Sequence, residues 1–505
     1  MNDQKQAPRP AADVAGDAKK LRQLAAMVQD TVETIIEEWS SKTNQTTVAK
    51  SSIADQDEFK IPSHKLYHAQ RVLAAAAGSI EELVSDPSLR LIGFSTQYWE
   101  SRALHIAAEH RLADLMEAGV EAGASDGVHV NTLAAKVGIE AKKLSRVLRC
   151  LASQHIFQEV ALDRFANNRV SKALVNNEPL RAYIMLFALD IFTTADCLPV
   201  ALKDPVLGPS YKTNETAFNL ALGTSKTRWQ WLEEQVRQDS RAANGGNSRG
   251  YPRLMAGSEA HNSGKESSTV ATTTGPLVPR PELAIFGLAM VGGGRLTSTP
   301  HLFDYPWQDL GSGATVVDVG GGQGGFSMQL SRLYPGLVFV VQDSPSMIEQ
   351  AREFWEKENP DAHAQGRARL MPHDFFTQNP VEGADVYWLR YILHDWSDDY
   401  CVGILSSIRA SMGPNSRILI ADQVMNTTAP ASTSSSSTPA PEPLLPNYGH
   451  YIRYSHQRDL AMMGLINGIE RTPSQFQEIV ERAGLRIVKI WECRTQVSLV
   501  ECRLL

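Results

Sequence analysis

From Ser312 to Leu505 the apolar residues form short runs that alternate with amphipathic stretches such as FSMQLSRLY. The apolar runs are ATVVDV, LVFVVQD, ADVYWLRYI, SRILIADQV, RIVKIWEC and QVSLVECRL. Strands that alternate with helices are typical of a mostly parallel sheet with helices on both faces. The last two runs follow each other closely, which predicts an antiparallel hairpin at the end of the sheet. The pattern therefore predicts a Rossmann-like α/β domain over residues 312–505.

Before residue 196 the pattern is helical. LRQLAAMVQDTVETIIEEW and YWESRALHIAAEHRLADLMEAG carry apolar residues three and four positions apart, as one face of a helix requires. Further on, NTLAAKVG and EAKKLSRVLRCLASQ are predicted to be two helices joined at Gly138, and a short β pair follows in FQEVALDRFANN. This order resembles a winged helix. Such modules can bind DNA, but the second helix's Lys142, Lys143, Arg146 and Arg149 have no broad basic surroundings, which favours a structural or dimerising role.

Three polar stretches interrupt these blocks and bury too little apolar surface to offset their ordering entropy. They are the N-terminal tail, a Gly/Ser/Thr-rich insertion at about 241–275 and a Ser/Thr/Pro-rich insertion at about 427–446. We expect a disordered tail over 1–18, a helical winged-helix-like domain over 19–195, a helical connector over 196–311 and the α/β domain over 312–505. The connector and the α/β domain each hold one insertion as a flexible loop.

The glycine-rich segment after the first predicted strand indicates a nucleoside-cofactor site. VVDVGGGQGGF places Asp318 before Gly320 and Gly322, and Asp343 closes the second predicted strand, where a carboxylate can accept hydrogen bonds from ribose hydroxyls. Gly320, Gly322 and Gly325 also match the dinucleotide pattern G-x-G-x-x-G. Asp318 would repel a pyrophosphate, whereas S-adenosylmethionine has no phosphate and carries two cationic groups. S-adenosylmethionine is therefore favoured over NAD and over a turn that binds nothing.

Further polar residues fall at the ends of the later predicted strands. Asp374 precedes Phe375 in MPHDFF, where the aromatic ring can stack on adenine, and Arg390–His394 and Asp422 end the next two strands. An imidazole with a pKa near 6.5 can take a proton from a phenol, whose pKa is about 10. Such a base needs a carboxylate on its other ring nitrogen, and Asp422 and Glu470 are the candidates. With thirteen histidines in the chain, only its position distinguishes His394 from a structural histidine.

Composition and charge limit the kinds of partner, cellular location and metal site that the chain is expected to have. The net charge of −7 argues against nucleic acid or an anionic membrane as the main partner. The chain shows neither a signal peptide nor an apolar run approaching 18 residues, so no membrane span is expected. Five scattered cysteines without a C-x-x-C pair predict reduced thiols, a cytoplasmic location and no metal site.

DVGGGQG, VVQD, PHDFF, LRYILHDWSDD, ILIADQVM and DLAMMGLINGIERTPSQF together resemble the plant- and fungal-type O-methyltransferases that use S-adenosylmethionine. The resemblance covers the chain from about Leu66 onward, apart from the two insertions. It implies that His394 is the base, flanked by Asp422 and Glu470, and that the winged-helix-like domain forms a homodimer. It also implies that the cofactor contacts are Gly320, Asp343, Asp374, Phe375 and Arg390. Met290 in FGLAM and Met463 match methionines that hold an aromatic substrate, although core packing explains them nearly as well.

The resemblance to fungal members implies a phenolic polyketide or similar aromatic natural product as the acceptor. Two other functions remain open at this point. One is N- or S-methyl transfer on the same scaffold, and the other is a non-catalytic or DNA-associated regulator that keeps the fold. The intact His394 argues against the regulator.

Overall fold

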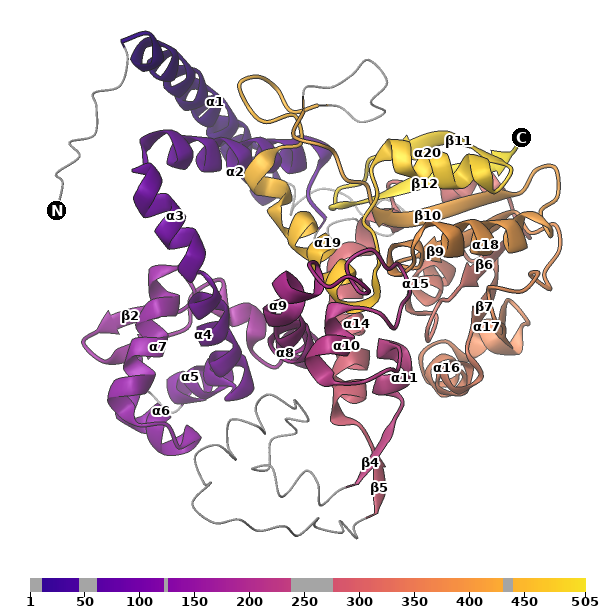
Figure 1. Cartoon of the computed structure of the whole chain (residues 1–505), viewed down its shortest axis with the longest axis horizontal. Helices are drawn as coiled ribbons and strands as arrows, with labels where there is room; N and C mark the ends of the chain where they lie inside the picture. The colour runs from indigo at the N-terminus through magenta and orange to yellow at the C-terminus, as the bar shows by residue number, and fades with distance from the viewer. Residues whose placement is uncertain (1–10, 45–60, 122–125, 238–275, 430–438) are drawn as a thin grey trace. The chain divides into compact units, whose positions relative to one another are not determined.

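The computed structural model describes residues 11–44, 61–121, 126–237, 276–429 and 439–505 (Figure 1). Contacts within the chain divide it into two compact units. The sheet unit comprises Met1–Arg90, Thr297–Leu460 and Gly468–Leu505, and the helical unit comprises Leu91–Leu296 and Ala461–Asn467. This division differs from the expected one, because the first two long helices belong to the sheet unit and the end of the predicted connector does too.

The sheet unit is built on seven strands in the order β11-β12-β10-β9-β6-β7-β8 (Figure 1). The strands are β6 (Thr315–Val319), β7 (Val338–Asp343), β8 (Ala368–Pro372), β9 (Val386–Arg390), β10 (Arg417–Gln423), β11 (Leu485–Trp491) and β12 (Val497–Leu504). From β10 to β8 all neighbours are parallel, whereas β12 runs antiparallel to both β10 and β11. The predicted mixed sheet and its C-terminal hairpin are confirmed.

Helices cover both faces of this sheet because its strands are apolar on both sides. Tyr387 and Leu389 of β9 pack in the core cluster that includes α18 and α20, while Val386 and Trp388 pack in the cluster that includes α15. Strands buried on both faces are typical of parallel sheets. The helices of this unit are α1 (Ala11–Asn44), α2 (His64–Val84), α15 (Gly325–Leu333), α16 (Pro345–Glu358), α17 (Pro360–Ala364), α18 (Asp398–Arg409), α19 (Arg453–Ile466, whose end lies in the helical unit) and α20 (Pro473–Arg482).

The strand order places a switch point between β6 and β9. The chain proceeds from β6 outward to β7 and β8, and then returns to the other side of β6 to form β9 and β10. Ligands of such sheets bind outside the carboxyl ends of the strands at this point. The glycine-rich turn follows β6 and the segment Arg390–His394 follows β9. The topology therefore brings the two most informative sequence motifs to one edge.

The helical unit contains the predicted winged-helix-like module. Its elements are α4 (Tyr98–Glu109), α5 (Leu112–Glu121), β1 (Val128–His129), α6 (Val130–Val137), α7 (Ala141–Ser153), β2 (Gln158–Ala161) and β3 (Arg164–Ala166). The three strands form a sheet in the order β1-β3-β2. Gly138 ends α6 in the left-handed conformation, with φ of 71°, which explains the turn predicted there. After it come α8 (Glu178–Ala188), α9 (Asp190–Ala201), α10 (Ala217–Leu222), α11 (Arg228–Leu232), β4 (Gln235–Arg237), β5 (Leu277–Pro279) and α14 (Pro281–Thr297).

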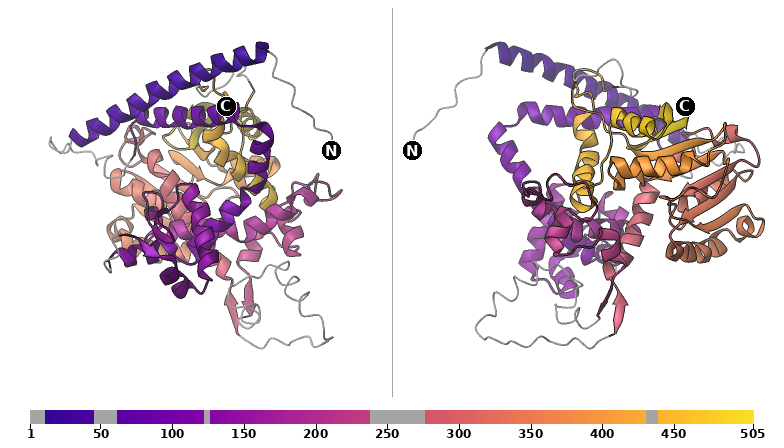
Figure 2. Two further views of the ribbon diagram at one scale, coloured as in Figure 1. Left: turned by 90° about the vertical axis from the view of Figure 1, so that its left-hand side faces the viewer. Right: turned by 45° about the vertical axis from the view of Figure 1, so that its right-hand side comes forward.

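Two expectations about polar segments are wrong in part. Helix α1 begins at Ala11, within the predicted tail, and lies along α2 (Figure 2). Leu444 and Tyr448 pack in an apolar cluster with Leu24 and Val72 of these helices, so the end of the predicted insertion at 427–446 belongs to the core. The long-range apolar contacts explain the difference, because the local Ser/Thr/Pro composition does not record them. The predicted insertion at 241–275 lies outside the described residues.

Among the described residues, one segment is long and apolar enough, by length and composition alone, to cross a membrane. Glu178–Ala201 has a mean hydropathy of 1.7 over its best window. The segment comprises α8 and α9, which meet at Leu189, and Ala182, Leu186 and Ile191 pack in an apolar cluster of the helical unit. Burial of this kind is typical of the core helices of a globular unit.

Candidate active site

The glycine-rich turn and the end of β7 form one hydrogen-bonded corner. The backbone N–H of Gly322 donates to Oδ2 of Asp343 at 2.9 Å, and the N–H of Ser344 donates to Oδ1 at 2.7 Å. Gly320 and Gly322 both have positive φ, and a Cβ on Gly320 would lie 2.5 Å from Cδ1 of Ile392. The turn therefore requires glycine for its conformation and for its close packing. Asp343 keeps lone pairs that can accept further hydrogen bonds from a ligand.

Asp318 lies behind this turn as a buried acid. Its Oδ2 accepts a hydrogen bond of 2.6 Å from the Ser327 hydroxyl, and a Cβ on Gly321 would meet the Asp318 carboxyl group at 2.5 Å. Burial raises the pKa of Asp318 to about 6, although the Ser327 hydrogen bond and the charge of Arg390 oppose the shift. At neutral pH a largely ionised acid behind the turn suits a cationic ligand and disfavours a pyrophosphate.

The other predicted cofactor residues lie at the same edge. Asp374 is exposed and caps its own turn by accepting from the N–H of Phe376. The Phe375 ring lies 3.6 Å from the position of a Cβ on Gly320, so it borders the turn. Nη2 of Arg390 donates to Thr297, while its buried Nε has no hydrogen-bond partner among the described residues. The glycine cradle, the carboxylate of Asp343 and the ring of Phe375 together fit S-adenosylmethionine.

His394 follows β9 in a short 3₁₀ turn, Leu393–Asp395, and is buried. Its Nδ1 lies 3.0 Å from Oε1 of Glu470, a residue that is itself 3% exposed. Because an ionised carboxylate only accepts, Nδ1 carries the proton and Nε2 keeps the lone pair when the ring is neutral. Burial alone would lower the pKa of His394, but the carboxylates of Asp395 and Glu470 outweigh it and hold that pKa above its usual value.

Asp422 does not orient the imidazole, which corrects one of the two alternatives from the sequence. Both of its carboxylate oxygens lack a hydrogen-bond partner within the described part of the chain. Burial raises the pKa of Asp422 to about 6, and the charge of His394 opposes that rise. Asp422 therefore acts on His394 through charge, and Glu470 makes the hydrogen bond. The aspartate side chain is one methylene shorter than glutamate, which explains why it does not reach.

Three residues complete the surroundings of His394, and the sequence did not single them out. Oδ1 of Asp395 lies 3.2 Å from Nε2 of His394, and Nη2 of Arg458 lies 3.5 Å from the same nitrogen. The ring of Tyr391 is centred 5.3 Å from that of His394, and Tyr391 has a φ of 54°. A positive φ at a bulky residue is uncommon, and such strain gathers at functional sites.

The predicted substrate-binding methionines belong to the helical unit. Met290 lies on α14 and is 44% exposed, whereas Met463 lies on α19 and is partly buried. Their neighbours Ala289 and Met462 are part of one apolar cluster that also contains Tyr183, Phe187, Trp229 and Phe286. This cluster is packed apolar core of the helical unit, and neither Met290 nor Met463 is one of its members.

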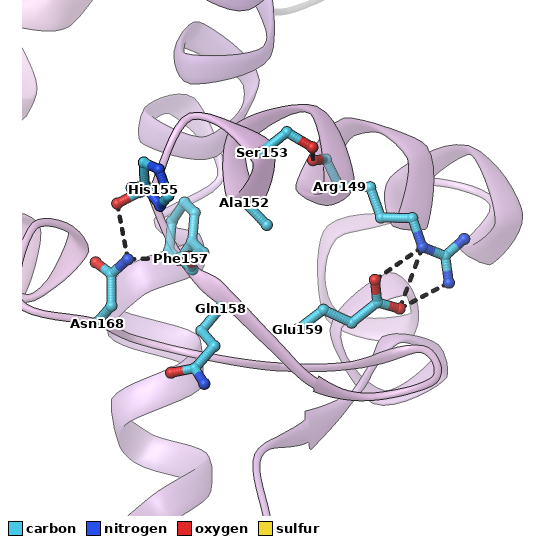
Figure 3. Close-up of a pocket in the computed structure, with 8 residues that line it drawn as sticks. All are labelled: Arg149, Ala152, Ser153, His155, Phe157, Gln158, Glu159 and Asn168. Atoms are coloured by element: carbon cyan, nitrogen blue, oxygen red, sulfur yellow. Dashed lines mark hydrogen bonds and ion pairs between the residues drawn. The ribbon is translucent and has the colours of Figure 1, made fainter.

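A separate surface hollow lies in the winged-helix-like module (Figure 3). It is lined by Arg149, Ala152, Ser153, His155, Phe157, Gln158, Glu159 and Asn168. The Arg149 guanidinium is paired with Glu159 and Asp163, at 2.7 and 3.0 Å. None of the predicted site residues lines this hollow, and its arginine is neutralised by its own acids.

Comparison with protein families agrees with this geometry. Residues 306–486 match the model of the O-methyltransferase domain, and residues 92–177 match that of the O-methyltransferase dimerisation domain. The chain is 50% identical over 486 residues to O-methyltransferase tpcA of Aspergillus fumigatus, covering 96% of each protein. It is equally identical, with the same coverage, to O-methyltransferase gedA of Aspergillus terreus.

Solved structures share the fold. The crystal structure of OxaC in complex with SAH and oxaline aligns over 95% of this chain and 100% of that one, with a TM-score of 0.61 and 20% identity. The structure of the mitomycin 7-O-methyltransferase MmcR aligns over 83% of this chain and 98% of that one, with a TM-score of 0.57 and 24% identity.

Proposed function

The chain belongs to the S-adenosylmethionine-dependent O-methyltransferases, and we propose that it methylates a phenolic hydroxyl of an aromatic natural product with His394 as the general base. The observation that carries this proposal is the buried His394–Glu470 pair at the edge where the glycine-rich turn also lies. A hydrogen bond from Nδ1 to Glu470 leaves Nε2 as the only ring nitrogen able to accept a proton.

His394 and Glu470 divide the proton chemistry between them. S-adenosylmethionine, when bound, supplies a methyl group whose bond to a positively charged sulfur breaks readily. The chain has only to orient the acceptor, remove its proton and exclude water. Nε2 of His394 takes the phenolic proton, and Glu470 stabilises the resulting imidazolium through Nδ1. General-base catalysis of this kind contributes about 10²–10⁴-fold.

The strand-end residues are proposed to hold the cofactor. Asp343 would accept from the ribose hydroxyls, and Phe375 would stack on the adenine. Asp318 and Arg390 lie deeper, where Asp318 can compensate the cationic methionyl part. Gly320 and Gly322 allow the backbone to approach the ligand closely. Asp374, exposed at the end of β8, is proposed as a further polar contact.

A phenol is favoured as the acceptor for a physical reason. A phenol, with a pKa of about 10, gives up its proton to an imidazole much more readily than an aliphatic alcohol does, while a carboxylate is already ionised at neutral pH and needs no base. Met290 and Met463 are proposed to contact the aromatic ring of the acceptor, as the resemblance in sequence implies. The relatives are O-methyltransferases of fungi, which supports a fungal natural product as the acceptor. A cytoplasmic location is part of the proposal. The proposed methylation of a phenol is tested by incubating purified protein with labelled S-adenosylmethionine and a panel of phenolic polyketides. Transfer of the label to none of them would reject that activity.

The pH dependence of kcat/KM is expected to follow His394. The base works only when neutral, and the carboxylates of Asp395 and Glu470 hold its pKa above the usual 6.5 or so. The rate should fall about tenfold for each unit of pH below that raised pKa. Asp395→Asn removes one of the two carboxylates, so the acid limb should move to lower pH. An acid limb below pH 6 in the wild type, or one that Asp395→Asn leaves in place, would contradict this.

We propose that the protein is a homodimer formed through the region of helix α3 (Pro87–Thr96). Not one residue of α3 is buried, and Leu89, Leu91, Ile92 and Phe94 are each 58–72% exposed. Four large apolar side chains exposed on one short helix are typical of an interaction site. The dimerisation-domain match begins at residue 92, which supports a second copy as the partner.

Replacing both Leu91 and Phe94 with glutamate should convert the dimer into a monomer at micromolar concentration. The two charges would be buried in the interface without partners, which costs several kcal/mol. Light scattering measures the mass. Leu505→Glu is the matched control, because Leu505 is 80% exposed and lies outside the helix. A wild-type monomer would refute the dimer, and a dimeric double variant would refute this interface.

A further inference from the structure

Arg458 lies beside the proposed base although it comes from a distant helix. It is on the first part of α19, its side chain is 12% exposed, and its Nε lies 3.1 Å from Oε1 of Glu470. That same carboxylate oxygen lies 3.0 Å from Nδ1 of His394. One glutamate therefore holds both the imidazole and the guanidinium in place.

The guanidinium is fixed from a second direction. Its carbon lies 4.1 Å from the centre of the Tyr391 ring, within the range of a cation–π contact. Because the guanidinium is planar and its Nε is fixed on Glu470, the position of Nη2 follows. Nη2 lies 3.5 Å from Nε2 of His394, the nitrogen proposed to receive the proton.

This spacing suits one oxygen atom bound by both groups. A phenolic oxygen about 2.8 Å from Nε2 can also lie about 2.9 Å from Nη2, because the two nitrogens are only 3.5 Å apart. The hydroxyl then donates to Nε2 and accepts from Nη2. Charge-assisted hydrogen bonds are roughly twice as strong as neutral ones, and this one strengthens as the oxygen becomes negative.

We propose that Arg458 is a further catalytic residue, which binds the acceptor oxygen and stabilises the negative charge that develops there as His394 removes the proton. This inference rests on the proposed function. The O–H bond breaks and an N–H bond forms at Nε2, so the oxygen keeps the electron pair that attacks the methyl carbon. The methyl–sulfur bond breaks with its electron pair remaining on sulfur, and the proton on His394 is later released to solvent.

The charged groups around His394 balance this step. The Glu470 carboxylate lies 3.0 Å from Nδ1 of His394 and the Asp395 carboxylate lies 3.2 Å from Nε2, so both bring negative charge to the ring. Arg458 brings a positive charge to the same ring, and the Asp422 carboxyl on β10 interacts with it through charge. Asp395 and Glu470 favour the imidazolium, whereas Arg458 disfavours it. Without Arg458 the base would be protonated over a wider pH range, and the phenolate would lose its counter-charge.

The test compares Arg458→Gln with Arg453→Gln on a series of substituted phenols related to an accepted substrate. Arg453 is an exposed arginine on the same helix, so it is a matched control. Arg458→Gln should lower kcat by about 10²-fold on weakly acidic phenols. The loss should shrink as the phenols become more acidic, because ionised acceptors need less help. The acid limb of kcat/KM should also move to higher pH, and Arg453→Gln should change neither.

Arg458→Lys covers the case in which the glutamine variant does not fold. It keeps the charge next to Glu470 but not the two-pronged geometry, and it should retain more activity on acidic phenols than on weak ones. An equal loss on all phenols together with an unmoved acid limb would reduce Arg458 to a structural partner of Glu470 and overturn the inference. A wild type that methylates no phenol would instead overturn the proposed function.

Discussion

His394→Ala is expected to lower kcat by about 10²-fold or more on a neutral phenol, with little change in the affinity for S-adenosylmethionine. The variant removes the nitrogen that accepts the proton, while the glycine-rich turn and Asp343 keep their hydrogen bonds to each other. Raising the pH should restore part of the rate, because more of the phenol then ionises in solution. Steady-state kinetics across pH, with calorimetric titration of the cofactor, measures both effects.

Glu470→Gln provides the graded comparison. The amide oxygen can still accept from Nδ1, so the ring keeps its orientation but loses a charge that stabilises the imidazolium. The loss in kcat should therefore be smaller than that of His394→Ala. Full activity of His394→Ala on a neutral phenol, without pH dependence, would remove His394 from the mechanism. If His394→Ala kept nearly full activity and the enzyme accepted only thiols or acids, the result would instead indicate methyl transfer to sulfur or to an already ionised acceptor.

The sheet could be predicted because its signal is local. Six of the seven strands of the α/β domain are apolar runs within a few residues of their observed bounds, and β12 pairs with β11 and β10 as the closing hairpin requires. The exception is β8 (Ala368–Pro372), which lies at the edge of the sheet and is not a continuous apolar run. The division into units could not be predicted, because it depends on contacts between residues far apart. Val72 packs with Leu444 and Tyr448, and no local pattern in either segment records the other.

The residues of the site likewise include some that the sequence could predict and one that it could not. His394 follows a strand and Glu470 stands in the GIERT segment between α19 and α20, and both motifs could be identified from the sequence; the structure places His394 Nδ1 3.0 Å from Oε1 of Glu470. Arg458 was missed because it lies on a helix 64 residues away, and its proximity depends on how α19 packs. A signal did exist. Arg458 and Asp459 directly precede the apolar stretch LAMMGLI, and charges at the start of a buried stretch usually have a buried partner.

The tail and the second insertion show why composition alone misjudges a segment. Tyr448 stacks on Arg71, whose guanidinium carbon lies 4.0 Å from the ring centre, and the Tyr451 hydroxyl lies 2.7 Å from that of Tyr67. These aromatic contacts anchor the residues that follow the Ser/Thr/Pro run to α2. A deletion within the Ser/Thr/Pro-rich insertion that extends to Ala440 would therefore remove part of an apolar cluster, because Ala440 itself is buried there.

Asp343→Ala is expected to weaken S-adenosylmethionine binding by about 1–3 kcal/mol, which is roughly 5–150-fold in Kd. The carboxylate is the proposed acceptor for the ribose hydroxyls, and it also holds the N–H groups of Gly322 and Ser344, so alanine removes a ligand contact and loosens the turn. Calorimetric titration measures the affinity.

Asp343→Asn is the control that separates the two effects, because its amide oxygen can keep one backbone hydrogen bond while the negative charge is lost. If ribose recognition dominates, Asp343→Asn should lose most of the affinity that Asp343→Ala loses; if the turn dominates, the asparagine variant should bind nearly as well as the wild type. Unchanged affinity in the alanine variant, or tight binding of NAD by the wild type, would show that the corner of Asp343 and the glycine-rich turn is not the cofactor site.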